Sequence, residues 1–295
     1  MQAVKPVSDL TPAERFNFLV TNRVPRAALT RFMGWFSKIE NALVRELSIR
    51  AWQFFVDDLR LDEALKPTFS SLHDCFTREL KPGARPIDDD PDVIVSPCDA
   101  VVGQFGSLDG VEAVQAKGFP YPVAELLGDA KAAERLRDGL FVTLRLKSSM
   151  YHRFHAPCDG HIDEVQYISG DTWNVNPIAL KSIERLFCRN ERAVIDIDTG
   201  DSNEHVTLVP VAAILVASMR LHGLSGPLNL QYAGPNRIPL ERRLAKGDEV
   251  GYFEHGSTIV MFVKGRFEFV ADIATDRIIR MGQPLLRRNI SDKQQ

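Results

Sequence analysis

The sequence has few cysteines and no long apolar run, and these two shortages exclude several classes of protein. The four cysteines are widely spaced and form no C-x-x-C pair, so neither a zinc ribbon nor a dithiol redox motif is indicated. No window holds the roughly 18 apolar residues of a membrane-spanning helix, and the first residues lack the apolar core of a secretory signal. We therefore expect reduced structural thiols in a cytoplasmic chain that can at most lie on a membrane surface.

An overall excess of positive charge is also missing. The 295 residues include 36 Lys and Arg against 39 Asp and Glu, which gives a formal net charge of −3, and 44% of them are hydrophobic. Such a composition is typical of a soluble globular protein and gives no indication of a nucleic-acid partner. The length predicts about two domains or one large one.

The N-terminal region differs from this average because it is basic and rich in aromatic residues. Residues 12–50 carry seven Arg and Lys against three Glu, a local net charge of +4. A capping box over residues 11–14 predicts the start of a helix. Further on, one apolar helical face is formed by Leu29, Phe32, Met33 and Phe36, which follow the i, i+3, i+4, i+7 spacing. Such helices suit an anionic membrane surface, but the same face could pack on the rest of the protein, and periodicity does not decide between the two.

From about residue 92 onward the sequence consists of short β-rich runs separated by Gly, Pro, Asn and Asp. Examples are "LFVTLRL", "GHIDEVQYI", "RAVIDIDT" and "STIVMFV", and a helix is predicted among them over residues 123–138. Residues 80–92 have the composition of a linker. We therefore predict an α+β fold, in which a helical membrane-associating arm of amphipathic helices (residues 1–80) precedes a β-rich, barrel-like catalytic domain (residues 81–295).

Side chains that could perform chemistry stand in three short segments. His152 and His155 lie three apart in "MYHRFHAPCDG", Asp99 lies in "SPCDAVVG", and Ser257 follows Gly256 at the start of an apolar run. Each alone has an ordinary structural explanation, because single His residues are commonly satisfied surface or core groups, and Asp and Gly–Ser commonly form turns. Together Asp99, His155 and Ser257 supply an orienting acid, a base and a nucleophile. A strand would point the two histidines to opposite faces and a turn would bring them together, and their spacing leaves both open.

Five segments taken together resemble the bacterial phosphatidylserine decarboxylase family, pyruvoyl-dependent enzymes of phosphatidylethanolamine synthesis. They are "SPCDAVVG", "AKGFPYPVAELLG", "MYHRFHAPCDG", "VNPIALKSIERLFCRNERAV" and "EVGYFEHGSTIVMFV". The likeness extends from about Leu72 to Gly282, and the joint order of its H-x-x-H-x-P, RNER and Gly–Ser–Thr blocks is specific. One departure is His255, which stands where the family most often has Leu.

The resemblance implies self-cleavage at the Gly–Ser–Thr site. Ser257 would attack the carbonyl of Gly256, with His155 as its base and Asp99 holding the tautomer of that base. Cleavage would leave residues 257–295 as a separate small chain. Gly256 has no Cβ, which allows close approach to its carbonyl.

The resemblance also implies the reaction that follows. Ser257 would become a covalent pyruvoyl group, which forms a Schiff base with the amine of phosphatidylserine and accepts the electron pair released with CO₂. His152 would return a proton to the substrate. No metal is required for this chemistry.

A diacyl lipid substrate remains in its bilayer, so the resemblance favours the membrane interpretation of residues 12–50. We expect a peripheral enzyme on the cytoplasmic face of the cell membrane. Its expected partners are phosphatidylserine and an anionic membrane surface, with the two cleaved chains held together. The sequence leaves a homodimer open.

Two other classes of protein compete with this hypothesis. A metallohydrolase could use His152 and His155 as zinc ligands, but the chain has no second cluster with a recognisable zinc spacing. A lipoyl-type carrier would account for the turn and strand in "KGDEVGYFEHGSTIV", but it needs a modifiable Lys at a hairpin tip, and no convincing one is visible. Metal analysis tests the first alternative, and the intact mass tests the second.

Overall fold

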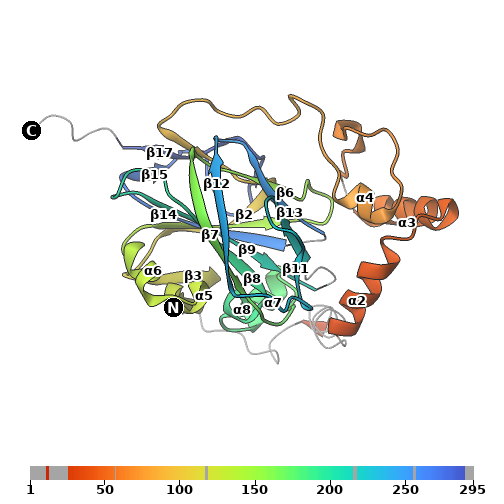
Figure 1. The fold of residues 1–295 in the computed structure, drawn as a ribbon, viewed down its shortest axis with the longest axis horizontal. Coiled ribbons are helices and arrows are strands. Elements are labelled where there is room, and N and C mark those ends of the chain that lie inside the picture. Colours follow the sequence, from red (N-terminus) through yellow and green to blue (C-terminus); the bar gives the residue numbers. More distant parts are fainter. Residues whose placement is uncertain are drawn as a thin grey trace, which may run out of the picture.

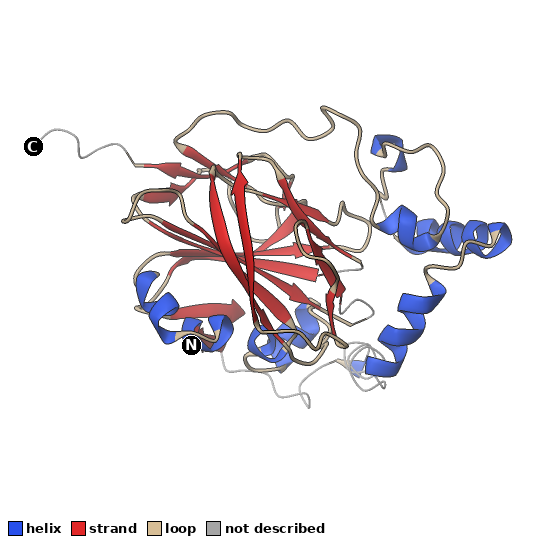
Figure 2. Ribbon diagram, viewed as in Figure 1, coloured by secondary structure: helices blue, strands red, loops and turns tan. Residues whose placement is uncertain are grey.

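The computed structural model describes residues 11–12, 26–56, 58–116, 119–214, 218–254 and 257–289. Helices α2, α3 and α4 lie at one side of the molecule, and sheets make up most of the remainder (Figure 1). Figure 2 shows a second group of short helices below the largest sheet. The predicted α+β class, with helices first and a β-rich body after them, is confirmed.

The helices are short, and their ends follow local signals. The Oδ1 atom of Asn41 accepts hydrogen bonds from the backbone N–H groups of Leu43 (3.0 Å) and Val44 (3.2 Å), which caps the first turn of α3. The bounds are α2 (Arg26–Phe36), α3 (Ala42–Phe55), the 3₁₀ helix η2 (Leu61–Glu63), α4 (Leu72–Phe76), α5 (Val123–Leu127), α6 (Ala130–Arg135), α7 (Pro177–Ser182) and α8 (Leu186–Arg189).

The helix predicted over residues 123–138 is two helices, α5 and α6. Gly128 lies between them with a φ of +65°, a left-handed conformation that ends α5. Asp129 then caps α6, because its Oδ1 accepts from the N–H groups of Lys131 (2.8 Å) and Ala132 (3.1 Å). Helix periodicity continues through this break, which explains why the sequence pattern did not predict it.

The strands reproduce most of the predicted β-rich runs. Their bounds are β1 (Val93–Val95), β2 (Ala100–Ser107), β3 (Glu112–Ala116), β4 (Phe119–Pro122), β5 (Leu140–Leu146), β6 (Arg153–His155), β7 (Gly160–Ile168), β8 (Arg192–Ile197), β9 (His205–Ala212), β10 (Ser218–Leu221), β11 (Leu228–Asn229), β12 (Arg237–Leu244), β13 (Glu249–Phe253), β14 (Ser257–Lys264), β15 (Phe267–Phe269), β16 (Ile278–Ile279) and β17 (Pro284–Arg288).

The strands form one large antiparallel sheet and three smaller ones. The large sheet has the order β12-β7-β8-β9-β14-β5-β2-β16, and a second sheet has the order β11-β10-β13-β6. The other two are β1-β17-β15 and the hairpin β3-β4. In the described part of the chain the large sheet is open, since its end strands β12 and β16 are not paired with each other, and the expected barrel-like shape is not confirmed.

Two hydrophobic clusters cover the two faces of the large sheet, and β14 contributes to both. Ile259 and Met261 lie in a cluster that includes Phe154 of β6, whereas Val260 lies in the cluster formed with helices α5 to α8, which includes Leu126. Seven successive residues of β14 are buried, so an almost continuous apolar run is required there rather than an alternating one. The sheet is therefore sandwiched between a second sheet and a layer of helices.

The segment expected to link arm and body forms a long loop. Residues 81–92 contain neither helix nor strand, and the chain passes there from the side of α4 to the side of β1 and β17 (Figure 1). Much of the predicted capping box, as well as His255 and Gly256, lies outside the described residues. Among the helices that are described, none is long and apolar enough to span a membrane.

Candidate active site

Ser257 is the first residue of β14 and lies between two neighbouring strands. Its cross-strand partners are Leu146 of β5 and Ala212 of β9. The residue is only 1% exposed, and its Oγ has no hydrogen-bond partner among the described residues. An unpaired buried hydroxyl costs stability, so packing alone does not explain a Ser at this position.

A cavity of about 730 Å³ adjoins Ser257. Its apolar wall includes Met33 of α2 and Trp52 of α3, so the helical arm closes one side of the site. Two cations, Arg145 and Lys147, line it as well, and none of its described lining residues is Asp or Glu. A cavity with an apolar wall and unopposed positive charge suits an amphiphile with an anionic group.

His152 lies directly before β6, against the arm. Its ring centroid is 4.0 Å from that of Phe76, which also lines the cavity, and Phe76 in turn stacks on Trp52 at 5.5 Å. The Nδ1 atom of His152 is 2.8 Å from the carbonyl oxygen of Met150. Nδ1 therefore carries a proton and donates to that oxygen, which leaves Nε2 as the basic nitrogen of the ring.

His155 ends β6 and points to different surroundings. Its Nδ1 is 2.8 Å from the carbonyl oxygen of Gly247, and its Nε2 is 3.0 Å from the hydroxyl of Tyr151. The Nδ1–H group donates to the carbonyl, and Nε2 accepts from the hydroxyl. The strand alternative thus holds for the two histidines, because each has its own set of partners.

Burial keeps both His155 and its partner Tyr151 uncharged. It lowers the pKa of His155, and the hydrogen bond to Gly247 and the charge of Glu249 offset only part of that effect. Burial also raises the pKa of Tyr151, so its hydroxyl stays neutral and can donate. The structure therefore holds a neutral imidazole with its lone pair on Nε2.

Gly247 is a contributor that the sequence analysis missed. Its φ is +89°, and a Cβ atom there would lie 2.1 Å from Cδ1 of Ile87. Only Gly fits this conformation and this space, and its carbonyl fixes the tautomer of His155. The turn "KGDE" is visible in the sequence, but residue type gives no indication that the carbonyl of Gly247 binds His155.

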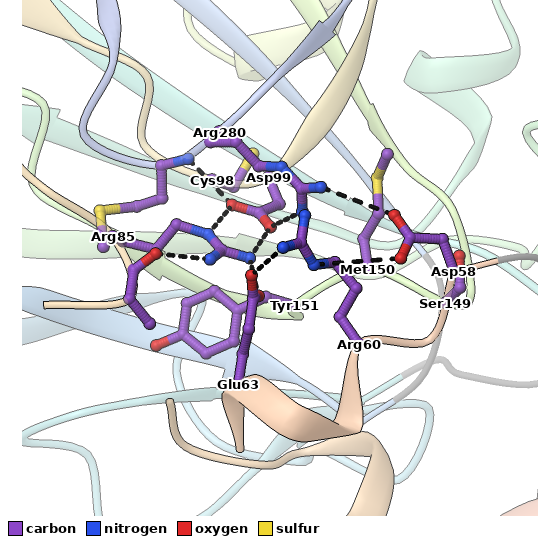
Figure 3. Close-up of polar contacts among 12 residues, drawn as sticks. Asp58, Arg60, Glu63, Arg85, Cys98, Asp99, Ser149, Met150, Tyr151 and Arg280 are labelled. Atoms are coloured by element: carbon purple, nitrogen blue, oxygen red, sulfur yellow. Dashed lines mark hydrogen bonds and ion pairs between the residues drawn. The ribbon is translucent and has the colours of Figure 1, made fainter. Parts of the chain in front are cut away.

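Asp99 is completely buried and is held by two arginines (Figure 3). Arg85 donates to both carboxylate oxygens, at 2.8 and 2.6 Å, and Arg280 donates to Oδ2 at 3.0 Å. The backbone N–H of Met281 donates to Oδ1 at 2.9 Å. Charge-assisted and bidentate bonds of this kind compensate for burying a carboxylate.

The same arginines connect Asp99 to the arm. Glu63 of η2 binds Arg85 at 2.8 Å and Arg60 at 2.8 Å, and Asp58 lies 3.9 Å from Arg60 and 3.7 Å from Arg280. Figure 3 shows that these groups close a ring of alternating charges. We call it the charge ring, and its members are Asp58, Arg60, Glu63, Arg85, Asp99 and Arg280.

No described hydrogen bond joins the three triad candidates to one another. The described bonds of Asp99 go to the charge ring and to Met281, and those of the His155 ring go to Gly247 and Tyr151. Asp99 acts on His155 through its charge, a minor influence that raises the pKa of the imidazole. The tautomer of His155 is thus fixed by a backbone carbonyl rather than by the carboxylate that the resemblance implied.

The RNER segment supports the strand opposite Ser257. Asn190 is fully buried, and its Nδ2 donates to the carbonyl of Ala212 at 2.8 Å. The carbonyl of Glu191 accepts from the N–H of Ala212 at 2.8 Å. Burial also raises the pKa of the Glu191 carboxyl to about 7. These contacts fix Ala212, the cross-strand partner of Ser257, and give the segment a positional role.

The described residues contain no group of three or more His, Cys, Asp or Glu side chains that could hold a metal ion. Both candidate histidines use Nδ1 to donate to a backbone carbonyl. Among the described residues, the metallohydrolase alternative therefore lacks a set of donor atoms.

Comparisons with known proteins agree with the motifs. The family model for phosphatidylserine decarboxylase matches residues 72–287. A phosphatidylserine decarboxylase proenzyme of Vibrio cholerae is 37% identical over 283 residues, which cover 88% of this chain and 94% of the relative. Proenzymes of the same name from Saccharophagus degradans and Chromobacterium violaceum are 35% and 36% identical, covering 90% and 92% of this chain and 95% and 99% of their own lengths.

Replacing Arg85 by Ala tests how strongly the charge ring holds Asp99. Because the side chain of Arg85 is only 6% exposed and Asp99 is fully buried, the variant should lose roughly 3–5 kcal/mol of unfolding free energy. Urea denaturation measures this loss. The Ser257→Ala change is added to every variant so that the expected self-cleavage cannot divide the chain. The control is Arg135→Ala, whose 2.6 Å ion pair with Asp196 is about half exposed and should contribute about 1 kcal/mol or less. Equal losses in the two variants would contradict a special role for the ring.

Proposed function

The chain belongs to the phosphatidylserine decarboxylase family, and on that premise we propose that it converts phosphatidylserine into phosphatidylethanolamine and CO₂ with a pyruvoyl group made from Ser257. One observation carries the proposal. Ser257 is a buried hydroxyl without a described partner at the edge of a cavity that has an apolar wall and two cations. The same residue can thus serve first as nucleophile and then as the point where the headgroup reacts.

Self-cleavage begins with attack of Ser257 Oγ on the carbonyl carbon of Gly256, which breaks the peptide bond and forms an ester. Elimination releases Gly256 as a carboxylate, and addition of water with loss of ammonia converts the former Ser257 to the pyruvoyl form. The products are chains 1–256 and 257–295. A hydroxyl without a hydrogen-bond partner among the described residues supports this first step, because no described side chain has to be displaced from it.

His155 is the base that this step requires. Its Nδ1–H is occupied by Gly247, so Nε2 is the nitrogen that takes the proton of Ser257. The hydroxyl of Tyr151 is bound to Nε2 and must move aside or pass the proton on. Asp99 assists through its negative charge, which favours the imidazolium that forms.

The mature site uses a different histidine. The pyruvoyl group supplies a conjugated carbonyl that accepts the electron pair released with CO₂. His152 then delivers a proton to the substrate carbon from Nε2, because its Nδ1 is committed to the carbonyl of Met150. Contact with Phe76 keeps this imidazole at the apolar wall, next to the region that a lipid would occupy.

The arm, residues 1–80, docks the enzyme on the cytoplasmic face of the membrane, and residues 81–295 form the catalytic domain. Phe54 and Phe55 are 85% and 81% exposed at the end of α3, and Trp35 of α2 is 64% exposed. The same two helices contribute Met33 and Trp52 to the cavity. Exposed aromatics on a basic segment suit an anionic interface, and a lipid there has a short path to Ser257.

Self-cleavage is tested by mass and by electrophoresis. The purified chain should separate under denaturing conditions into a large and a small fragment, and the small one should resist Edman sequencing because of its pyruvoyl end. Ser257→Ala should remain whole and inactive because it has no nucleophile. An uncut chain of 33.1 kDa that decarboxylates phosphatidylserine would contradict the proposal.

Variants should separate the two histidines. His155→Ala and Asp99→Ala should slow self-cleavage, whereas His152→Ala should still cleave but decarboxylate roughly 10²–10⁴-fold more slowly. The base must be neutral, and burial lowers the pKa of His155. The cleavage rate should therefore stay level through neutral pH and fall only below the ordinary value of 6.5. A rate that already halves at pH 6.5, or a fully active His152→Ala enzyme, would argue against these roles.

Membrane docking is tested by cosedimentation with vesicles that contain phosphatidylserine. Replacing Phe54 and Phe55 by Ser should weaken binding at least roughly tenfold at low and high salt, because buried aromatic area is lost. Replacing Arg45 and Arg50 by Gln should weaken it mainly at low salt. Val114→Ser, which changes an exposed apolar residue of β3, is the matched control. Unchanged binding by the Phe variant would mean that these side chains do not meet the membrane.

A further inference from the structure

Arg145 is a half-buried cation whose charge is not balanced by a close partner. It lies in β5, opposite Thr258 of β14 and Val101 of β2, and lines the cavity that adjoins Ser257. Its guanidinium has no hydrogen bond or ion pair with a described residue, and the charge of Asp276 is the one acidic influence on it. Burial outweighs that influence and lowers the pKa of Arg145. An unpaired cation in this position is costly unless an anion joins it.

Lys147 is a second cation at the cavity, and unlike Arg145 it is exposed. It follows β5 and also lines the cavity, and its ammonium forms no ion pair with a described residue. Between the two cations in sequence is Leu146, the cross-strand partner of Ser257. Residues two apart in an extended segment point to the same side, which here is the face opposite that of Leu146. It is the shared lining of the large cavity, rather than a shared strand face, that relates both charges to Ser257.

The arginines near these two cations are already neutralised by carboxylates and are not free to bind another anion. A smaller cavity of about 150 Å³ shares Lys147 and Ser149 with the large one, and its lining includes Arg60, Arg85 and Arg280. Those three arginines belong to the charge ring and already have carboxylate partners (Figure 3). The unopposed positive charge therefore faces the large cavity, in which no described lining residue is acidic.

We propose that Arg145 and Lys147 form a subsite that binds the phosphodiester of the lipid headgroup. This assignment rests on the proposed function, since it takes the serine amine to lie at Ser257. Two carbons and one oxygen join that amine to the phosphorus, a length that the side chains of Arg and Lys can span. The acyl chains then extend along Met33 and Trp52.

The carboxylate of the headgroup is a poorer occupant of this subsite than the phosphodiester. Negative charge leaves the carboxylate as CO₂ forms, so cations fixed on it would stabilise the substrate more than the transition state and would slow the reaction. The charge of the phosphodiester does not change in the reaction. Binding the phosphodiester therefore positions the headgroup without stabilising the substrate over the transition state. Arginine also suits the bidentate geometry of phosphate oxygens.

Calorimetric titration of the uncut Ser257→Ala chain with monomeric short-chain lipids tests the subsite without requiring activity. The two lipids are phosphatidylserine and phosphatidylethanolamine, which share the phosphodiester and differ in the carboxylate. Arg145→Gln and Lys147→Gln, each added to this chain, should weaken binding of both lipids roughly tenfold or more, the effect of losing a hydrogen bond to a charged group. In the cleaved enzyme the same changes should raise KM more than they lower kcat.

A double variant, Lys131→Gln with Arg243→Gln, controls for general electrostatics, because it removes two exposed cations outside the cavity. It should bind both lipids like the parent. Weaker binding of phosphatidylserine alone would assign the cations to the carboxylate and overturn the proposal, and so would unchanged binding of both lipids. If the parent chain bound neither lipid, the proposed function would fail together with the subsite. Complete self-cleavage of Arg145→Gln and Lys147→Gln on the Ser257 background excludes misfolding.

Discussion

The burial of β14 on both faces is the constraint on which the rest of the molecule depends. The strand lies between β5 and β9 and contributes side chains to both hydrophobic clusters, so its register cannot slip without moving apolar groups from one core to the other. Ser257 is the first residue of this strand and inherits its fixed position. A reactive hydroxyl is thus held by one of the two most buried long strands of the sheet, while its neighbours Leu146 and Ala212 lie at strand ends.

The helical arm is coupled to this centre by three kinds of contact. Ring contacts connect α3 to the imidazole, because Trp52 stacks on Phe76 and Phe76 contacts His152. Ion pairs of the charge ring connect η2 to Asp99. Arg78 adds a third link, because its guanidinium donates to the carbonyls of Leu59 and Ser149 at 2.9 Å each. The segment proposed to meet the membrane is therefore also part of the wall and of the electrostatics of the site.

Much of the fold followed from the sequence, because strand and helix periods reflect burial directly. The runs "LFVTLRL" and "GHIDEVQYI" coincide with β5 and β7, and the apolar face containing Phe32 lies in α2. The order in which strands pair was beyond prediction, since it depends on contacts between distant segments. The break at Gly128 needed knowledge of a backbone angle, and helix periodicity does not contain it. The site showed the same division: His155 was recognisable as a candidate base, but the carbonyl of Gly247, which fixes its tautomer, has no signature in residue type.

The antiparallel ladder around β14 has a consequence for a chain cut before Ser257. The small fragment would contain β14 to β17, and its strands pair with β5, β9, β2 and β1 of the large fragment. The large sheet could not stay whole if they separated, because β14 of the small fragment lies between β9 and β5 of the large one. The severed protein would behave as a non-covalent heterodimer whose two subunits are already assembled, and dissociation would amount to unfolding. The peptide bond before Ser257 would then contribute little to keeping the mature protein folded. The interface between the two fragments would be a hydrophobic core.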